Sequence, residues 1–340
     1  MGELATRRVG DSIASVTELG LGCAPLGDLF TVLSEEQAQR TLAAAWEAGV
    51  RYFDTSPFYG HGKSEHRVGH FLRQRPRSEF MVSTKVGRVF KAARDPANVV
   101  GDYFVGRLPF DFTYDYSYDG IMRSFEDSLQ RLSLPSVDML LIHDLDFWFH
   151  QKEAKVSAYL TQLVTSGWKA LDELRSSGQI KAIGAGINEV GMIPRFLDLV
   201  GVDFFIVALV YTLLDQDVLD VEFPLCERHG AGAVIGAVFA SGILATGPIE
   251  GATYRYEAAP PETLQKVKRM VDVCASHDVP LAAAAMQFPL AHPIVASIIP
   301  GALAPEHVTA NAGLLNHPIP ADLWSELKEE GLLREDAPTP

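Results

Sequence analysis

RYFDTSPFYG, residues 51–60, is a short apolar strand that runs directly into a polar turn. It places a carboxylate, Asp54, at the end of the strand and a phenol, Tyr59, five residues later. Lys85 follows the strand-like run FMVST, and His143 follows the run MLLI. In a barrel of alternating strands and helices, the carboxyl ends of the parallel strands meet on one face, where catalytic residues lie. A barrel would therefore gather these four ionisable side chains at one site.

Strand and helix patterns alternate along the chain. Helical periodicity occurs at residues 35–48, 65–73, 118–132, 166–177, 190–200, 217–229, 261–277 and 305–314, and a C-terminal helix is expected at about 320–331. Strands are expected at residues 19–22, 51–54, 80–85, 137–143, 180–186, 204–209, 233–237 and 295–299. The run at 204–209 is apolar throughout, which suits a strand buried on both faces of a parallel sheet. The pattern predicts an α/β fold, a (β/α)8 TIM barrel over about residues 18–315, in a single domain of residues 1–340.

Two segments depart from this alternation. Residues 8–17 have short β-branched runs around a Gly-Asp-Ser turn and predict an N-terminal hairpin. The connection at 86–117, after the third strand, is long and carries seven aromatic residues. A loop of this length inside a compact domain is usually functional, so we expect a substrate lid. The alternative is an aromatic cluster beneath an ordinary surface loop.

Motifs for other folds and chemistries are incomplete. A doubly wound sheet should carry a glycine-rich phosphate loop after its first strand, but the glycines at 20, 22 and 27 miss that spacing. GHGKS at 60–64 lacks the first glycine of the G-x4-G-K-[ST] phosphate loop. His66 and His70 stand one helical turn apart without an evident third ligand, so we expect no metal.

The composition restricts the partners. The 340 residues include 47% hydrophobic and 21% charged residues, and no apolar run approaches the length of a membrane span. A net charge of -14 argues against nucleic acid, which is bound by Lys and Arg. The three cysteines are few and far apart in the sequence, which suggests no disulfide framework. We therefore expect a cytoplasmic protein with a small-molecule substrate, without nucleic-acid or membrane partners, as a monomer or weak homo-oligomer.

The four ionisable residues form a plausible acid and base set. A phenol has an unperturbed pKa of about 10, and a neighbouring ammonium favours the phenolate, so Lys85 would lower the pKa of Tyr59. Asp54 would hold Lys85 charged, and His143 would hydrogen-bond the reacting oxygen. Each residue alone is equally typical of capping or packing; the four in order indicate catalysis. Such a set moves protons but accepts no electrons, so a redox reaction needs a cofactor.

These residues resemble the catalytic tetrad of the aldo-keto reductases. FDTSPFYGHGKSEHRVG at 53–69, STK at 83–85 and LIHD at 141–144 are similar to that family's motifs, and the resemblance extends from about residue 8 to 327. It implies an oxidoreductase in which a nicotinamide dinucleotide lies across the top of the barrel. Hydride would move between the nicotinamide and the substrate carbon, while Tyr59 handles the proton.

The resemblance also implies the cofactor contacts. They are Gly22, Cys23, Asn188, Tyr211, Phe239, Gly301, Ala302, His307 and Asn311. Asn188 would bind the carboxamide, whereas the usual Gln of the sixth strand is replaced by Ala208 and the usual stacking aromatic falls on Gly236. Family members that use the 2'-phosphorylated cofactor carry Lys or Arg near Gly301 and His307, and residues 270–327 contain neither. We therefore expect NAD rather than NADP.

A subgroup of the family oxidises pyridoxal, or sugars of the L-fucose and D-arabinose type, with NAD. FTYDYSYDG at 112–120, GINE at 186–189 and YTLLDQ at 211–216 resemble its patterns. Both substrate types form cyclic hemiacetals that oxidise to lactones. The expected pocket is Phe58, Phe112, Tyr114, Trp148 and Phe149, whose rings suit a planar pyridine. Pyridoxal 4-dehydrogenase activity is favoured, with L-fucose or D-threo-aldose 1-dehydrogenase, an NADPH-dependent carbonyl reductase, and a cofactor-sensing regulatory subunit as alternatives.

Overall fold

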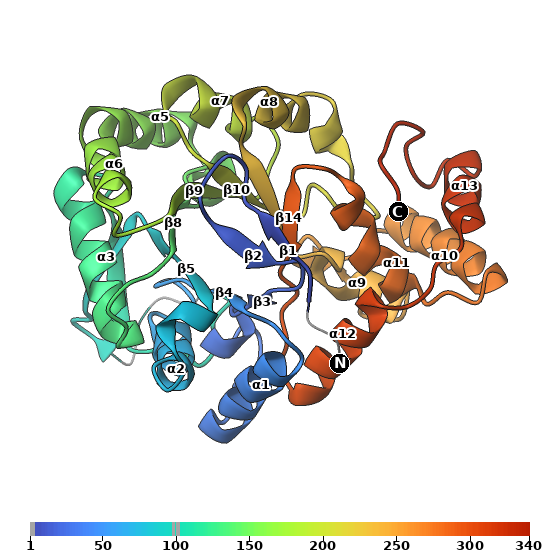
Figure 1. Ribbon diagram of the computed structural model, residues 1–340, viewed down its shortest axis with the longest axis horizontal. Coiled ribbons are helices and arrows are strands. Elements are labelled where there is room, and N and C mark those ends of the chain that lie inside the picture. The colour runs from blue at the N-terminus through green and yellow to red at the C-terminus, as the bar shows by residue number, and fades with distance from the viewer. Residues whose placement is uncertain (1–3, 97–98, 100–102) are drawn as a thin grey trace.

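The computed structural model describes residues 4–96, 99 and 103–340 and contains a closed parallel barrel (Figure 1). Its strands, in spatial and chain order, are β3 (Leu21–Gly22), β4 (Tyr52–Asp54), β5 (Met81–Val86), β8 (Met139–His143), β9 (Ala182–Ile187), β10 (Phe204–Ala208), β11 (Gly232–Gly236) and β14 (Val295–Ile298). Parallel bridges from Leu19 to Ile298 and from Gly22 to Gly301 join the first strand to the last. The expected TIM barrel is confirmed.

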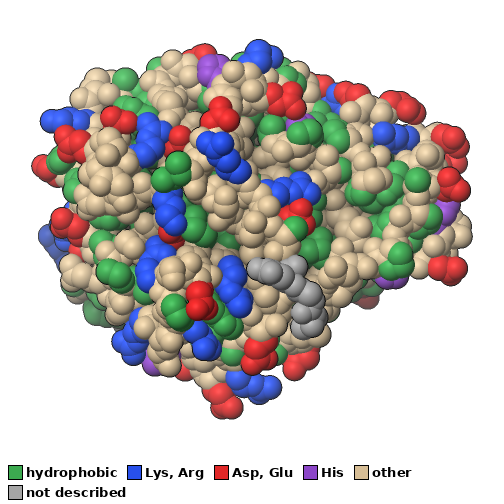
Figure 2. All heavy atoms as spheres, viewed as in Figure 1, with side chains coloured by type: hydrophobic (Ala, Val, Ile, Leu, Met, Phe, Trp, Pro, Cys, Tyr) green, Lys and Arg blue, Asp and Glu red, His purple; other side chains and the backbone are tan. Residues whose placement is uncertain are grey.

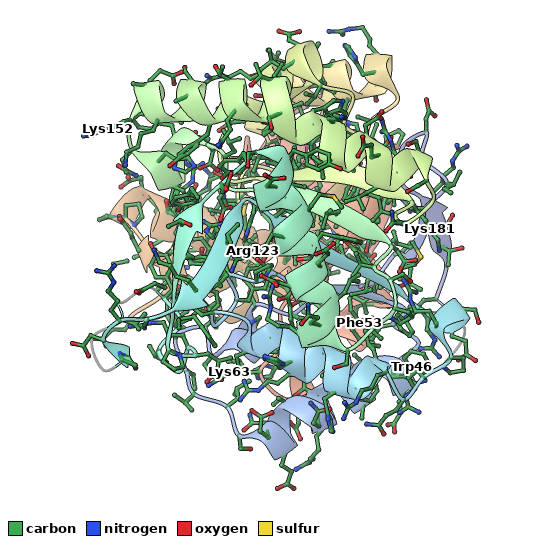
Figure 3. The ribbon with its side chains drawn as sticks, turned by 90° about the vertical axis from the view of Figure 1, so that its left-hand side faces the viewer. Trp46, Phe53, Lys63, Arg123, Lys152 and Lys181 are labelled. Atoms are coloured by element: carbon green, nitrogen blue, oxygen red, sulfur yellow. The ribbon has the colours of Figure 1, made fainter. Side chains whose placement is uncertain are left out.

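Helices surround the barrel (Figure 1). They are α1 (Glu35–Glu47), α2 (Lys63–Leu72), α3 (Tyr118–Leu132), α4 (Phe147–His150), α5 (Glu153–Gln162), α6 (Trp168–Ser176), α7 (Met192–Leu199), α8 (Glu222–His229), α9 (Ile243–Thr246), α10 (Pro261–Ser276), α11 (Leu281–Gln287), α12 (Pro305–Leu315) and α13 (Ala321–Glu329). Figure 3 shows α2 and α3 on the outside of the sheet, with Arg123 on α3. In the described part of the chain, no helix is long and apolar enough to cross a membrane.

Several helices differ from the sequence-based expectation: the short helices α4 and α9 were not expected, and α8 begins at Glu222 rather than at residue 217. The helix expected at 166–177 continues backward through a π-helical turn, Leu163–Gly167, into α5, so one helical rod begins at Glu153. The helix α11 was not expected, because its LAAAAMQ sequence has no polar face to generate a periodic signal. Its central alanines are fully buried, which explains the uniform composition.

The predicted N-terminal hairpin is present, and it closes one end of the barrel. Strands β1 (Thr6–Arg8) and β2 (Ser15–Thr17) pair in antiparallel register. Val9, Ala14 and Val16 from the hairpin share a buried cluster with inward-facing barrel residues. Figure 1 looks onto this closed end, and Figure 2 shows the mixed acidic and basic surface of the same face. The carboxyl ends of the strands therefore point away from that view, which leaves the opposite end for a site.

The connection after β5 is more ordered than an expected loop. Strands β6 (Arg88–Ala92) and β7 (Phe110–Tyr114) pair as an antiparallel hairpin at the carboxyl end of the barrel. The expected lid covers residues 86–117, of which 97–98 and 100–102 lie outside the described residues. A second small hairpin, β12 (Thr253–Tyr254) with β13 (Glu257–Ala258), follows β11. Both hairpins extend the rim of the barrel around its open end.

Candidate active site

The barrel brings the predicted tetrad together. Asp54 ends β4, Lys85 lies near the end of β5, and His143 ends β8. The Lys85 Nζ donates hydrogen bonds to both carboxylate oxygens of Asp54, at 2.9 and 2.7 Å, and to the Thr55 carbonyl at 2.8 Å. The ammonium and the carboxylate are both almost fully buried. Because the Lys85 ammonium donates to three oxygens, this buried salt bridge holds both side chains in fixed positions at the base of the site.

Tyr59 stands beside this pair. The Lys85 Nζ is 4.7 Å from the centre of the Tyr59 ring, and the His143 ring centre is 5.8 Å from it. The turn carrying Tyr59 packs directly on Gly27, where an added Cβ would come within 2.5 Å of the Tyr59 carbonyl carbon. That close backbone contact requires glycine and fixes the position of the tyrosine.

The proton affinity of Tyr59 differs from the expectation. Burial raises the pKa of Tyr59 well above its usual 10, and the Asp54 and Asp144 carboxylates raise it further. The predicted lowering of this pKa by Lys85 is therefore wrong for the protein without ligands. The physical reason is that Asp54 compensates the ammonium charge, while the phenol itself is desolvated.

His143 is a buried, neutral imidazole. Its Nδ1 is 3.0 Å from the Ser56 hydroxyl, and its Nε2 is 3.2 Å from Oδ2 of Asp144. Burial lowers the pKa of His143 well below 6.5, and the Arg88 and Lys85 cations lower it further. The imidazole is thus a hydrogen-bonding group rather than a cation at neutral pH.

A cavity of about 680 Å³ opens above the tetrad at the carboxyl end of the strands. The tetrad lines it, together with the predicted residues Gly22, Phe58, Trp148, Phe149, Asn188, Phe239, Gly301 and His307. Ala208 and Gly236, at positions where the resemblance implies larger side chains, also line it. Cofactor and ligand cavities span roughly 300 to 1,000 Å³, so this one has room for a bound dinucleotide and part of a substrate.

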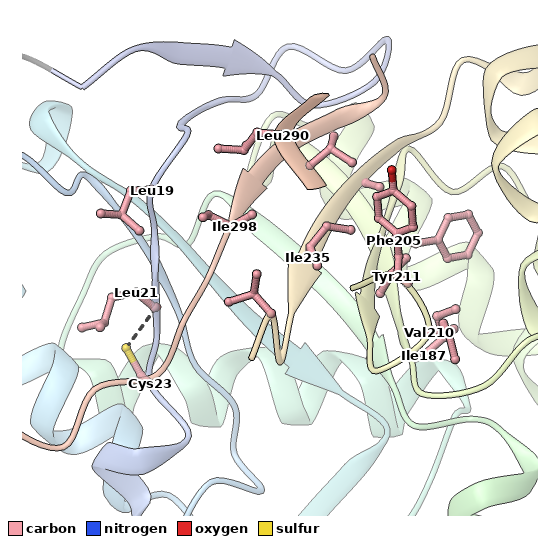
Figure 4. Packing of buried hydrophobic residues seen from close by; sticks show 14 of the residues in the cluster. Leu19, Leu21, Cys23, Ile187, Phe205, Val210, Tyr211, Ile235, Leu290 and Ile298 are labelled. Atoms are coloured by element: carbon pink, nitrogen blue, oxygen red, sulfur yellow. Dashed lines mark hydrogen bonds between the residues drawn. The ribbon is translucent and has the colours of Figure 1, made fainter. Parts of the chain in front are cut away.

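Three predicted cofactor residues lie behind the cavity wall rather than in it. Cys23 is fully buried, with its thiol 3.5 Å from the Leu21 carbonyl (Figure 4). Ala302 and Asn311 are buried next to the lining residues Gly301 and His307. Their side chains do not line the cavity.

Tyr211 lies in the hydrophobic core (Figure 4), and its side chain does not line the cavity. Its ring packs against Phe223 and Phe288, with centres 4.7 and 5.3 Å away. The chain turns at Leu209, which has a φ of 70°, before reaching this residue. The expected side-chain contact of Tyr211 with the cofactor is therefore corrected to a packing role.

Phe112 and Tyr114 were expected in the substrate pocket and instead support it from behind. Both are on β7, two residues apart, and share one face of that strand. The Phe112 ring lies 5.6 Å from Phe58, which itself lines the cavity. From the same segment, Tyr103 and Phe104 do line the cavity. The segment therefore supplies aromatic rings to the cavity wall, but from residues other than the expected ones.

Sequence reasoning missed Arg88, a buried cation behind the tetrad. Arg88, on β6, donates to Oδ2 of Asp144 at 2.9 Å, and both side chains are almost fully buried. Asn188 Nδ2 donates to Asp144 Oδ1 at 3.0 Å and to Asp146 Oδ2 at 3.1 Å. The only available signal was the presence of charged residues directly after β5 and β8. Asp144 itself lines the cavity.

The lining of the cavity is compatible with a nicotinamide dinucleotide. Gly22, Gly186, Gly236 and Gly301 line the cavity, so backbone can approach a ligand closely there. Within the described ranges, Lys85 is the one Lys or Arg that lines the cavity, and its ammonium is paired with the Asp54 carboxylate. The residues present therefore fit a nicotinamide dinucleotide.

Comparisons with known proteins agree with this geometry. The Aldo/keto reductase family matches residues 18–330. Pyridoxal 4-dehydrogenase from Microbacterium luteolum is 41% identical over 338 residues, covering 96% of this chain and 97% of that protein. D-threo-aldose 1-dehydrogenase from Pseudomonas sp is 38% identical over 331 residues, covering 96% of each.

A solved structure agrees as well. The holo form of aldo-keto reductase AKR11C1 from Bacillus halodurans superposes with a TM-score of 0.75 at 26% identity. The match covers 98% of this chain and 97% of that chain. Fold, chain length and sequence thus point to the same family.

Proposed function

Because the chain belongs to the aldo/keto reductase family, whose members use nicotinamide cofactors, we propose that it is an NAD-dependent dehydrogenase of cyclic hemiacetals. Its favoured substrate is pyridoxal, which would be oxidised to 4-pyridoxolactone. The observation that carries this proposal is the assembled set of Asp54, Tyr59, Lys85 and His143 at the floor of an aromatic cavity. A bound nicotinamide supplies the hydride acceptor.

The chain's own residues would manage the proton. Tyr59, as phenolate, takes the hemiacetal hydroxyl proton while the C–H bond of the same carbon breaks and its electron pair leaves as hydride. The carbon–oxygen double bond of the lactone forms in that step, so atoms and electrons balance. Lys85 stabilises the phenolate at 4.7 Å from the ring centre, and His143 hydrogen-bonds the reacting oxygen.

The preference for NAD is supported by the lining of the cavity. A 2'-phosphate is normally held by Arg or Lys, and the lining residues Gly301, Leu303 and His307 provide neither. His307 offers a hydrogen bond but not the permanent positive charge of Arg or Lys. The ribose hydroxyls of NAD need no such charge.

Pyridoxal is favoured by the rings that face the cavity. Phe58, Phe104, Trp148 and Phe149 line it, and flat apolar faces suit a pyridine ring. The relative of 41% identity is named pyridoxal 4-dehydrogenase. An aldose remains the second candidate, because sugar rings also pack on aromatic faces and the relative of 38% identity is named D-threo-aldose 1-dehydrogenase.

The test is formation of reduced nicotinamide by the purified protein at mildly alkaline pH. Pyridoxal, L-fucose and D-arabinose are each supplied with NAD, and the lactone is identified by mass spectrometry. Tyr59→Phe should abolish turnover while leaving NAD binding intact, and Tyr118→Phe, which removes an exposed hydroxyl bonded to Glu173, is the matched control. Binding of NAD without turnover of any hemiacetal or carbonyl would refute the proposal and favour a regulatory role.

A further inference from the structure

Arg88 is a buried cation immediately behind the cavity. Its guanidinium carbon lies 4.2 Å from the ring centre of Phe58 and 5.1 Å from those of Tyr114 and Phe149. Within the described residues, its Nε and Nη1 atoms have no hydrogen-bond partner. Burying a guanidinium is costly unless a carboxylate compensates it, and here Asp144 is that carboxylate. The ion pair of Arg88 and Asp144 thus lies between the aromatic side chains and the tetrad.

Asp144 connects that cation to two residues of the site. Its Oδ2 accepts from Arg88 at 2.9 Å and is 3.2 Å from Nε2 of His143. Its Oδ1 accepts a hydrogen bond from Nδ2 of Asn188, the residue that the family resemblance assigns to binding of the cofactor carboxamide. The backbone of Asp144 has a φ of 47°, a left-handed conformation that Asp and Asn tolerate better than other side chains. A strained residue at a strand end is a common feature of functional sites.

These contacts define the proton positions on His143. An ionised carboxylate repels a nitrogen lone pair, so the 3.2 Å separation between Nε2 and Oδ2 of Asp144 favours the tautomer with the proton on Nε2. In a neutral imidazole Nδ1 is then an acceptor, and the Ser56 hydroxyl donates to it at 3.0 Å. The Ser56 oxygen in turn accepts the Phe58 backbone N–H at 3.1 Å. The two hydrogen bonds of Ser56 therefore agree with an unprotonated Nδ1.

We propose that Arg88 and Asp144 are positioning residues that hold His143 in its Nε2-protonated tautomer, with Nε2–H available at the cavity. The catalytic consequence rests on the proposed function, whereas the tautomer does not. Arg88 keeps Asp144 ionised against the effect of burial, which raises the pKa of that carboxyl. Without Arg88, Asp144 takes up a proton and donates it towards Nε2, which reverses the tautomer and removes the donor.

The other charged groups around His143 do not replace Arg88 in keeping Asp144 ionised. Lys85 faces it from β5 but is held by Asp54, and Tyr59 faces it from the turn after β4. Asp146 lies on the other side of Asn188, and burial and the neighbouring Asp144 raise the pKa of Asp146 to about 7, so it carries a full negative charge only above neutral pH. None of these groups replaces the direct contact of Arg88 with Oδ2.

The first test reads the tautomer without activity. Imidazole ¹⁵N spectra of the full-length protein, with the His143 signals assigned by their loss in His143→Gln, should show a protonated Nε2 and an unprotonated Nδ1. Asp144→Asn, which suits the left-handed backbone, should shift both signals. A wild-type spectrum with the proton on Nδ1, or an Asp144→Asn spectrum unchanged at His143, would overturn the proposal.

The second test reads the pH profile of hemiacetal oxidation. Arg88→Met should gain an acidic limb, with activity at pH 6 falling by about tenfold relative to pH 9 beyond any wild-type change. Arg88→Lys should restore the wild-type shape. Arg123→Gln, on the exposed side of α3 (Figure 3), is the matched control and should change nothing. If Arg88→Met folds and keeps the wild-type dependence of activity on pH, Arg88 and Asp144 have only a structural role and the proposal is overturned.

The two tests separate the possible failures. A correct tautomer in a protein that turns over no hemiacetal would refute the proposed function and leave the positioning of His143 intact. If Arg88→Met does not fold, both the imidazole ¹⁵N spectra and the pH profile are measured on Asp144→Asn. Turnover with an unaffected tautomer and profile in Asp144→Asn would refute the positioning alone.

Discussion

The Lys85 ammonium lies 2.7 Å from Oδ2 of Asp54, with both groups almost completely shielded from water. This ion pair explains why the phenol beside it stays protonated: the positive charge is already compensated, and burial raises the pKa of Tyr59. In the proposed oxidation Tyr59 must ionise before it can take the substrate proton, and Lys85 would then stabilise that phenolate. The reaction therefore depends on the fraction of Tyr59 that is ionised.

Breaking this pair should destabilise the fold. Lys85→Met leaves the Asp54 carboxylate buried without its partner, which typically costs about 3 to 5 kcal/mol in the free energy of unfolding. Urea denaturation followed by circular dichroism measures this change. Adding Asp54→Asn to the same chain should recover part of the loss, and Lys268→Met, in an exposed pair on α10, should leave the stability nearly unchanged. Equal effects of the two lysine substitutions would contradict the account.

The oxidation rate should rise with pH. Because the pKa of Tyr59 is raised, only a small fraction is ionised at neutral pH, and this fraction grows about tenfold for each pH unit below the pKa. Initial rates with saturating NAD, measured from pH 7 to 9, should follow that increase. A plateau at neutral pH in the wild-type protein would show that another group serves as the base.

Cofactor choice should depend on the end of the cavity that contains His307. Fluorescence titration should give tighter binding of NAD than of NADP. His307→Arg should improve NADP binding by about tenfold or more, since a charge-assisted hydrogen bond contributes roughly 1.5 to 3 kcal/mol. His317→Arg, at a residue outside the cavity lining, is the control. Tighter NADP binding by the unmodified protein would overturn the assignment of NAD.

Asp146 should make stability fall as pH rises. Burial and the neighbouring Asp144 raise the pKa of Asp146 from 3.8 to about 7, so between pH 4 and 7 the folded state binds more protons than the unfolded state. This contribution is complete at low pH and is lost by pH 7, on the order of 3 kcal/mol. The lowered pKa of His143 acts in the opposite direction, so the comparison must isolate Asp146.

Asp146→Asn provides that comparison. Its free energy of unfolding, relative to the wild type, should improve steadily between pH 4 and 7, although loss of one acceptor for Asn188 or Phe149 lowers it by a constant amount. Urea titrations at four pH values measure the difference. A difference that is independent of pH would mean that Asp146 titrates normally.

The architecture was largely predictable because a parallel barrel has a strong local signature. Apolar strands such as β10 and amphipathic helices such as α1 repeat in order, and the observed ends of these two differ from the expected ones by at most one residue. The positions of Asp54, Lys85 and His143 follow from strand ends alone. Topology then brings them together without information about side-chain packing.

The remaining details depend on contacts that a sequence pattern does not encode. Arg88 and Asp144 are 56 residues apart, and their pairing depends on how the β6–β7 hairpin folds back on β8. The same hairpin directs Phe112 and Tyr114 towards Arg88 instead of the cavity. At Tyr211, a positive φ two residues earlier redirects the chain into the core. Such local backbone choices are invisible to hydrophobic periodicity.

Transfer of a labelled hydride tests the central claim most directly. Pyridoxal deuterated at its aldehyde carbon, and L-fucose deuterated at C1, are each incubated with NAD and the purified protein. The account predicts that the deuterium appears in the reduced nicotinamide, that the product is the lactone, and that Tyr59→Phe prevents both. Reduced nicotinamide without deuterium, or unreacted substrates with NAD demonstrably bound, would contradict it.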